Sequence, residues 1–276
     1  MVGEKDVVFR ATMKAGHFIK ISSEIAKNFI PGTVWLDMKP DGTVEIKGND
    51  SKNTVSISLV LKNFSDYVCK KRQTVHIDIQ HFYRMIKNCK KKVPITLVIE
   101  SSESDHINII VGDVQTYLLI ERPQLVFSKD PTGYEEHPCV IDSKDFQVMC
   151  KEMQLTNGKT IQISQLSDGK LEFSIKTSLY GKTVPLGSRI VGKKPIKYKS
   201  ISMNFTFKIL TRLVKVPNIS HIIKVYFTEG KPLKICFDIN SFGEGCVYIR
   251  PLTDQSSDLI SIHESLADDE EDFNNL

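Results

Sequence analysis

Residues 81–92, HFYRMIKNCKKK, combine an apolar stripe with a basic surface. The apolar residues have the i, i+3, i+4, i+7 spacing of one helix face: Phe82, Met85, Ile86 and Cys89. The remaining positions carry Arg84, Lys87 and a run of lysines, and no Asp or Glu occurs from Ile79 to Ile99. The stretch therefore predicts a helix that buries one face and presents unbalanced positive charge on the other.

The same kind of helix recurs three more times at a nearly constant period. The aromatic residues that lead the four stripes are separated by 64, 64 and 61 residues: Phe18, Phe82, Phe146 and Phe207. After each helix, alternating apolar residues flank a polar or glycine-containing turn, which predicts a β-hairpin. These turns are centred on Gly42, Asp105, Gly169 and Gly230. Four copies of helix, strand, turn, strand predict an internal repeat.

Between Glu121 and Pro138 the alternation stops, and two prolines and a glycine predict a linker. We therefore expect an α+β chain with two similar domains, residues 1–121 and 139–252, joined by a linker at 122–138. Each domain is predicted to hold two βαββ-type repeats, with two helices backed by antiparallel β-sheet. Residues 181–200 are predicted to be a loop that the first domain lacks, and the acidic segment 253–276 is expected to be disordered.

The charge is unevenly distributed along the chain. The net charge is +4, but the segment from Asp254 to Leu276 holds eight acids and no Lys or Arg. The rest of the chain therefore has 25 acids against 37 basic residues, which favours a polyanionic partner over a basic surface kept only for solubility. The six cysteines are far apart and form no CxxC pair, so we expect a reducing, intracellular location with neither a disulfide nor a zinc site.

One basic helix is usually just a solvated surface, but four equivalent helices packed side by side would form a continuous basic wall. Such a wall would bind phosphates without reading the base sequence. The predicted DNA-binding residues are Lys14, Lys20, Lys27, Arg84, Lys87, Lys91, Lys144, Lys151, Lys208, Arg212 and Lys215.

Four segments also resemble a known family. NDSKNTVSISLVLKNF (49–64) is similar to a segment of the sliding clamps of eukaryotes and archaea, the proliferating cell nuclear antigen family. The opening helix with the following hairpin, the segment from Cys139, and VYIRPLTD (247–254) resemble other parts of those clamps. The resemblance implies a ring, usually a homotrimer, that encircles duplex DNA, is opened by a clamp loader and tethers DNA polymerase and other clamp-binding proteins. It implies a nuclear location, or a cytoplasmic replication site if the chain is viral, and no association with membranes.

The resemblance also implies two protein-binding surfaces. Ring closure would pair the edge strands 115–120 and 176–184 of neighbouring chains, through Gln115, Tyr117, Leu119, Leu179, Gly181 and Thr183. Partner peptides would enter a pocket formed by Met38, Leu125, Phe127, Pro232, Tyr248 and Pro251. The alternative for Leu125 and Phe127 is that they only hold the linker against the sheet.

Enzyme motifs are not found. The two Gly-Lys-Thr triplets lack the preceding glycine of a phosphate-binding loop, and no histidine has metal-ligand spacing. We therefore expect a non-enzymatic clamp that needs no cofactor. The alternatives are a subunit of a heterotrimeric checkpoint-type clamp and a monomeric DNA-binding processivity or transcription factor of the same fold.

Overall fold

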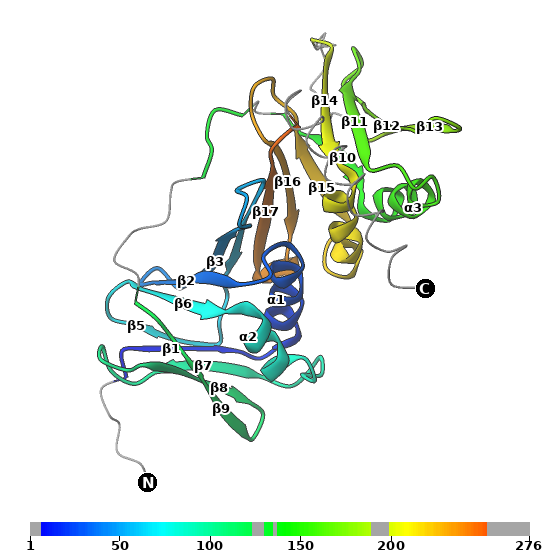
Figure 1. The fold of residues 1–276 in the computed structure, drawn as a ribbon. Coiled ribbons are helices and arrows are strands. Elements are labelled where there is room, and N and C mark those ends of the chain that lie inside the picture. Colours follow the sequence, from blue (N-terminus) through cyan, green and yellow to red (C-terminus); the bar gives the residue numbers. More distant parts are fainter. Residues whose placement is uncertain (1–6, 123–129, 135–136, 189–198, 253–276) are drawn as a thin grey trace, which may run out of the picture.

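The computed structural model describes residues 7–122, 130–134, 137–188 and 199–252, which form four successive units (Figure 1). Each unit is a strand, a helix and three further strands. The predicted repeat is therefore confirmed, and each copy contains one strand more than the βαββ pattern expected from the sequence.

The elements of the first two units, with β5 between them, are β1 Phe9–Met13, α1 His17–Phe29, β2 Thr33–Lys39, β3 Thr43–Asn49, β4 Val55–Leu61, β5 Asp66–Cys69, β6 Gln73–Asp78, α2 Ile79–Ile86, β7 Ile95–Ile99, β8 His106–Val111 and β9 Val114–Leu119. Those of the last two units are β10 Cys139–Asp142, α3 Ser143–Gln154, β11 Thr160–Gln165, β12 Leu171–Lys176, β13 Gly181–Leu186, β14 Ile201–Thr206, α4 Phe207–Leu210, the 3₁₀ helix η1 Thr211–Asn218, β15 Ile222–Tyr226, β16 Leu233–Asp238, the 3₁₀ helix η2 Asn240–Phe242 and β17 Gly243–Ile249.

The strands form three antiparallel sheets. In these sheets, the last three strands of each unit pair with the first strand of a neighbouring unit. The outer two sheets have the orders β5-β1-β7-β8-β9 and β13-β12-β11-β14. The central sheet has eight strands in the order β10-β15-β16-β17-β4-β3-β2-β6. The two halves of this order mirror each other about the β17–β4 pair. Backbone hydrogen bonds between β17 and β4 join the last unit of the chain to the first.

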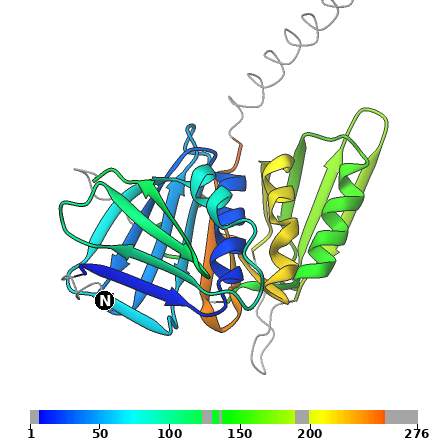
Figure 2. The same cartoon turned by 90° about the horizontal axis from the view of Figure 1, so that it is seen from below.

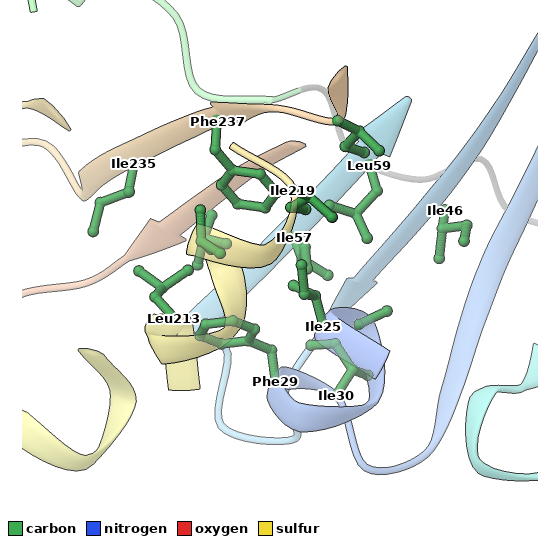
Figure 3. Packing of buried hydrophobic residues seen from close by; sticks show 14 of the residues in the cluster. Ile25, Phe29, Ile30, Ile46, Ile57, Leu59, Leu213, Ile219, Ile235 and Phe237 are labelled. Carbon is green, nitrogen blue, oxygen red and sulfur yellow. The ribbon is translucent and has the colours of Figure 1, made fainter. Parts of the chain in front are cut away.

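The four helices pack in a single layer against the sheets (Figure 2). Helix α1 contacts α2 on one side and η1 on the other, and η1 in turn contacts α3. Figure 3 shows Ile25 and Phe29 of α1 among residues of β4, η1 and β16. Because these residues come from both halves of the chain, one apolar core is shared across the central pair of strands.

Local sequence explains where two of the helices begin. The carboxylate of Asp78 accepts a hydrogen bond from the His81 backbone N–H at 2.8 Å, and Asp142 caps α3 in the same way through the N–H of Lys144 at 2.7 Å. These side chains satisfy N–H groups that have no partner within the helix. The predicted stripe of α3 is confirmed, since Phe146, Met149, Cys150 and Met153 are all buried.

Two helices differ from their predicted form. Helix α2 ends at Ile86, and Cys89 reaches the core from the following turn, in which its N–H donates to the Ile86 carbonyl. The fourth helix becomes a 3₁₀ helix after Leu210, and its buried residues are Phe207, Leu210, Leu213 and Val216. This spacing of three residues matches the three residues per turn of a 3₁₀ helix.

The hairpins follow the predicted turns, with φ of +87° at Gly42 and +84° at Gly169. The prediction that residues 181–200 form a loop is wrong in its first part, because residues 181–186 are strand β13, paired with β12. Residues 189–198 and the acidic segment 253–276 lie outside the described residues.

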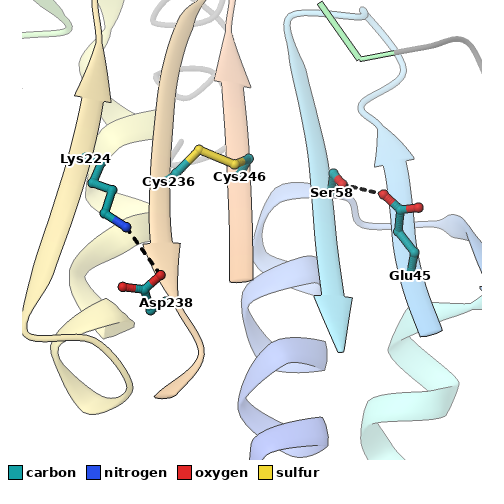
Figure 4. The surroundings of a disulfide bond; sticks show 6 residues. All are labelled: Glu45, Ser58, Lys224, Cys236, Asp238 and Cys246. Atoms are coloured by element: carbon teal, nitrogen blue, oxygen red, sulfur yellow. Dashed lines mark hydrogen bonds and ion pairs between the residues drawn. A yellow bond between two sulfur atoms is a disulfide. The ribbon is translucent and has the colours of Figure 1, made fainter. Parts of the chain in front are cut away.

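The expectation of no disulfide is contradicted, because Cys236 and Cys246 are joined (Figure 4). They are directly paired positions on β16 and β17, and their Cα atoms are 4.2 Å apart. The sequence did not indicate this link because it depends on the hairpin register and not on a cysteine motif. The other four cysteines are not part of a disulfide: Cys69, Cys89, Cys139 and Cys150.

In the described part of the chain, no helix has both the length and the apolar character needed to cross a membrane.

The start of β17 generates a stability prediction. Gly243 has a φ of +153°, and a Cβ atom there would lie 1.9 Å from the backbone oxygen of Val60 on β4. Since a backbone atom in the central sheet cannot move aside, Gly243→Ala is expected to lower the free energy of unfolding by about 3 kcal/mol. Denaturant unfolding measures this change.

The matched control is Gly32→Ala, because a Cβ atom at Gly32 meets nothing within 4 Å. Its unfolding midpoint is expected to stay close to that of the unchanged chain. Equal midpoints for the two variants would show that the β17–β4 junction is not tightly packed.

Candidate nucleic-acid interface and protein-binding surfaces

All eleven predicted DNA-binding residues lie on the four helices or in the turns next to them. Eight of these side chains are exposed: Lys14, Arg84, Lys87, Lys91, Lys144, Lys151, Lys208 and Lys215. The other three, Lys20, Lys27 and Arg212, are half-buried. The helices that carry these residues are neighbours in one layer (Figure 2), so the structure brings the predicted set onto a common helical surface.

Several of these cations also hold neighbouring helices together. The Lys20 ammonium on α1 donates to the Cys89 carbonyl beyond α2 at 3.1 Å, and the Lys27 ammonium lies 4.3 Å from the centre of the Tyr83 ring on α2. On the other side of α1, the Lys215 ammonium lies 3.0 Å from the Glu24 carboxylate. The sequence gave no signal for these contacts, because they join segments far apart in the chain.

Two acidic groups on the helix layer, Glu24 and Glu152, are paired with lysines. Glu24 contacts Lys215, and the Glu152 carboxylate on α3 lies 2.5 Å from the Lys182 ammonium on β13. His17, at the start of α1, adds little positive charge near neutral pH, because burial, together with the nearby charges of Lys91 and Lys20, lowers its pKa. Charge on the layer therefore comes mainly from Lys and Arg.

The two ends of the helix layer carry open strand edges. Strand β9 pairs only with β8, and β13 pairs only with β12, within the described part of the chain. Helix α2 contacts β9 and α3 contacts β13, so the two edges lie at opposite ends of the layer.

Large apolar side chains are exposed at both of these edges. On β9, Val114, Tyr117 and Leu119 are 64%, 64% and 66% exposed, and Leu179 in the turn before β13 is 96% exposed. The other predicted interface residues, Gln115, Gly181 and Thr183, are exposed too. The predicted second edge, 176–184, needs correction: Lys176 ends β12, residues 177–180 form a turn, and the edge strand is 181–186.

The described residues of the predicted partner pocket do not lie together: three lie near the ends of β16 and β17, and Met38 lies elsewhere in the central sheet. Tyr248 on β17 is 5% exposed, and Pro232 and Pro251 are half-buried near the ends of β16 and β17. Met38 is fully buried in the core and lies on β2, three strands away from β17 in the central sheet. Leu125 and Phe127 lie outside the described residues.

Strand alternation explains the position of Met38. In β2, every second residue faces the apolar core: Val34, Leu36 and Met38. On β17, Tyr248 is paired with Lys234 of β16 and faces the opposite side of the sheet. The sheet therefore has an inner face toward the helices and an outer face, which carries Lys234, Cys236, Cys246 and Tyr248.

The described part of the linker is attached to this outer face, which sequence reasoning missed. The Tyr134 hydroxyl donates to the Pro232 carbonyl at 3.1 Å, and the Lys231 ammonium donates to the carbonyls of Thr132 and Gly133. Asp130 lies 3.5 Å from the Lys47 ammonium on β3.

Tyr134 completes a cluster of three aromatic rings around one cation. Tyr226, Lys234 and Tyr248 are directly paired across β15, β16 and β17. The Lys234 ammonium lies 4.9 Å from the Tyr226 ring centre, 5.7 Å from that of Tyr248 and 5.2 Å from that of Tyr134. These distances permit cation–π attraction. We call these four residues the tyrosine cluster.

The described residues contain no group of three or more His, Cys, Asp or Glu side chains that could hold a metal ion.

Comparison with known proteins agrees with this arrangement. No family model matches the chain. It is 20% identical over 256 residues to the proliferating cell nuclear antigen of Dictyostelium discoideum, covering 86% of this chain and 96% of that one. It is also similar to the crystal structure of the proliferating cellular nuclear antigen of Entamoeba histolytica, with a TM-score of 0.76, 17% identity and coverage of 90% of this chain and 100% of that chain. The chain is therefore similar in sequence to a proliferating cell nuclear antigen along most of its length, and it shares the fold of these proteins.

Proposed function

We propose that the chain is a DNA sliding clamp and polymerase processivity factor that closes into a ring with copies of itself. The observation that carries this function is the single layer of four helices, with basic residues from every helix and an open strand edge at each end. In this proposal, residues 1–121 and 139–252 are the two clamp domains, and the chain acts as a scaffold without chemistry of its own.

The proposed channel contact is with phosphates. Duplex DNA carries one negative charge per roughly 1.7 Å of helix axis, so a lysine-bearing surface gains affinity by releasing counterions. Contacts of this kind position a protein without reading sequence. A surface with exposed cations on several helices suits a clamp that moves along DNA, because no position on the duplex is preferred over another.

The proposed ring closes head to tail through unlike edges. An interface between two different surfaces of the same chain generates a ring when the rotation closes. Pairing β9 of one chain with β13 of the next would satisfy the backbone groups of both edges and cover Leu119 and Leu179. The family resemblance suggests three chains and therefore six domains around the channel.

The proposed docking site for DNA polymerase and other clamp-binding proteins, including a clamp loader, is the outer face near Pro232 and Tyr248. The helices cover the other face of the same sheet. A bound enzyme would therefore not compete with DNA for surface.

The DNA contact is tested by charge reversal on two helices. Lys87→Glu combined with Lys208→Glu is expected to weaken equilibrium binding to duplex DNA and to flatten its dependence on salt. Each lost phosphate contact should reduce the slope of log affinity against log salt by roughly 0.9. Binding measured over a salt series gives this slope.

The control for this experiment is Lys52→Glu with Lys71→Glu, which changes net charge equally at exposed positions away from the helices. Its slope is expected to match that of the unchanged chain. Equal slopes for all three proteins would remove the helix layer from the DNA contact.

Ring closure is tested by two variants that each damage one edge. Leu119→Glu disables the β9 edge and Leu179→Glu disables the β13 edge, so each variant alone is expected to be a monomer of 31.3 kDa. A mixture of the two variants retains one intact pair of edges and is expected to form a dimer and nothing larger. Light scattering or native mass spectrometry distinguishes these species.

Three results would contradict this assembly. A monomeric unchanged chain would favour the monomeric processivity factor. A mixture that stays monomeric would show that β9 and β13 are not partners. Assembly only in the presence of other, related chains would favour the heterotrimeric checkpoint-type clamp.

The attachment of the linker to the outer face predicts a pH effect. Burial raises the pKa of Tyr134 to about 12 and, together with neighbouring negative charges, also raises the pKa of Tyr248. A tyrosine whose folded pKa is raised stabilises the fold below its ordinary pKa of about 10, and this contribution is lost as pH rises through the folded pKa. Subtracting the phenolate absorbance of Tyr134→Phe from that of the unchanged chain isolates the titration of Tyr134. Its midpoint is expected near pH 12. A difference centred near pH 10 would mean that Tyr134 is solvated.

A further inference from the structure

The Cys236–Cys246 disulfide lines a cavity on the outer face of the central sheet. The cavity has a volume of about 290 Å³ and is also lined by Tyr226, Lys234 and Tyr248 of the tyrosine cluster. Cys246 is partly exposed and Cys236 is 9% exposed. A small molecule in this cavity could therefore reach the sulfur atoms while the protein remains folded.

A disulfide at this position is unusual for the setting in which a clamp works. Replication takes place inside the cell, where glutathione and thioredoxin keep most thiols reduced. Disulfides found in such compartments are usually transient or redox-sensing, and exposed ones are more easily exchanged than buried ones. Neither hairpin strand depends on the bond for its pairing, because β16 and β17 share a full ladder from Leu233↔Ile249 to Asp238↔Glu244.

We propose that Cys236 and Cys246 form a reversible redox modification site that exchanges with small thiols and disulfides of the glutathione class, and that its oxidation state sets how firmly the linker residues 130–134 are held on the outer face. This goes beyond the clamp function, because it involves neither the helix layer nor the strand edges.

The coupling to the linker follows from the ladder between β16 and β17. The paired residues Lys234 and Tyr248 lie two positions from Cys236 and Cys246 on the same strands, and therefore on the same face of the sheet. Lys234 is the cation at the centre of the tyrosine cluster, and Tyr134 of the linker is one of the three rings around it. The disulfide beside this pair restricts the separation and twist of β16 and β17. When it is reduced to two thiols, only the backbone hydrogen bonds between the strands restrict them.

The four cysteines outside this disulfide are poorly suited to the same exchange. Cys89, Cys139 and Cys150 are buried, and burial raises the pKa of the Cys150 thiol to about 12. Cys69 is partly exposed, but burial of its thiol also raises its pKa. Because the thiolate is the reactive form, these four groups should react slowly in the folded protein.

The proposed oxidation balances without a further reagent. One thiolate of the reduced pair attacks glutathione disulfide, forms a mixed disulfide and releases one glutathione thiolate. The second protein thiolate then attacks the mixed disulfide, closes the Cys236–Cys246 bond and releases the second glutathione. The protein thus loses two electrons and two protons, and one glutathione disulfide becomes two glutathione molecules. Reduction is the reverse sequence.

The first experiment counts thiols in the folded full-length chain. The protein is equilibrated with glutathione at a series of ratios of thiol to disulfide, quenched with acid, unfolded and alkylated, and then weighed. Six alkylated cysteines are expected at the reducing end and four at the oxidising end, with circular dichroism unchanged. Cys236→Ser or Cys246→Ser should abolish the bond between these positions, whereas the control Cys69→Ser should keep the two-cysteine transition. A count that stays at six, or one that stays at four until the protein unfolds, would overturn the proposal.

The second experiment measures how the linker is held, using chymotrypsin cleavage after Tyr134. The Cys236→Ser, Cys246→Ser double variant is expected to be cut there at least about threefold faster than the oxidised unchanged chain, because a local opening becomes less costly. Cleavage after Tyr180, which is 55% exposed and lies in the turn before β13, is the internal control and should not change. Equal rates after Tyr134 would refute the coupling to the linker. Neither experiment depends on DNA binding or on ring assembly, so a failure here would leave the clamp function untouched.

Discussion

The pairing of β17 with β4 is the constraint on which the rest of the structure depends. Seven residue pairs, from Gly243↔Leu61 to Ile249↔Val55, join the last unit of the chain to the first. This ladder makes one eight-stranded sheet from two four-stranded halves, and it brings α1 against η1. Without it, the two pairs of helices would have no fixed relation, and neither a continuous basic surface nor two opposed strand edges would exist.

The helix layer shows how one set of residues serves packing and charge together. Lys20 and Lys27 contact groups on neighbouring helices, and such contacts reduce the freedom of each side chain without removing its positive charge. A cation held in place loses less entropy when it meets a phosphate. In the proposed clamp, the exposed lysines, such as Lys87 and Lys208, keep the adaptability needed to contact DNA without a preferred register.

The parts that the sequence predicted are those controlled by local pattern. The helical stripe led by Phe146 and the turns at Gly42 and Gly169 are each set by residues within a few positions. The errors lie where distant segments meet. Met38 was placed by resemblance, although its alternation with Asp37 points it into the core, and the Cys236–Cys246 bond depends on a register that no spacing encodes. The position of Tyr134 could not be predicted, because a linker without periodicity does not show which surface it contacts.

The inner and outer faces of the central sheet are built from alternate residues of the same strands. On β16, Leu233, Ile235 and Phe237 are buried in the core, while Lys234 and Cys236 face the cavity on the other side. Because successive side chains point to opposite faces, one strand supports both the helix layer and the linker attachment with different residues. Changes at outward positions can therefore alter the outer face without repacking the core beneath the helices. A chain with 20% identity to the Dictyostelium protein can therefore keep the same fold while carrying an outer surface of its own.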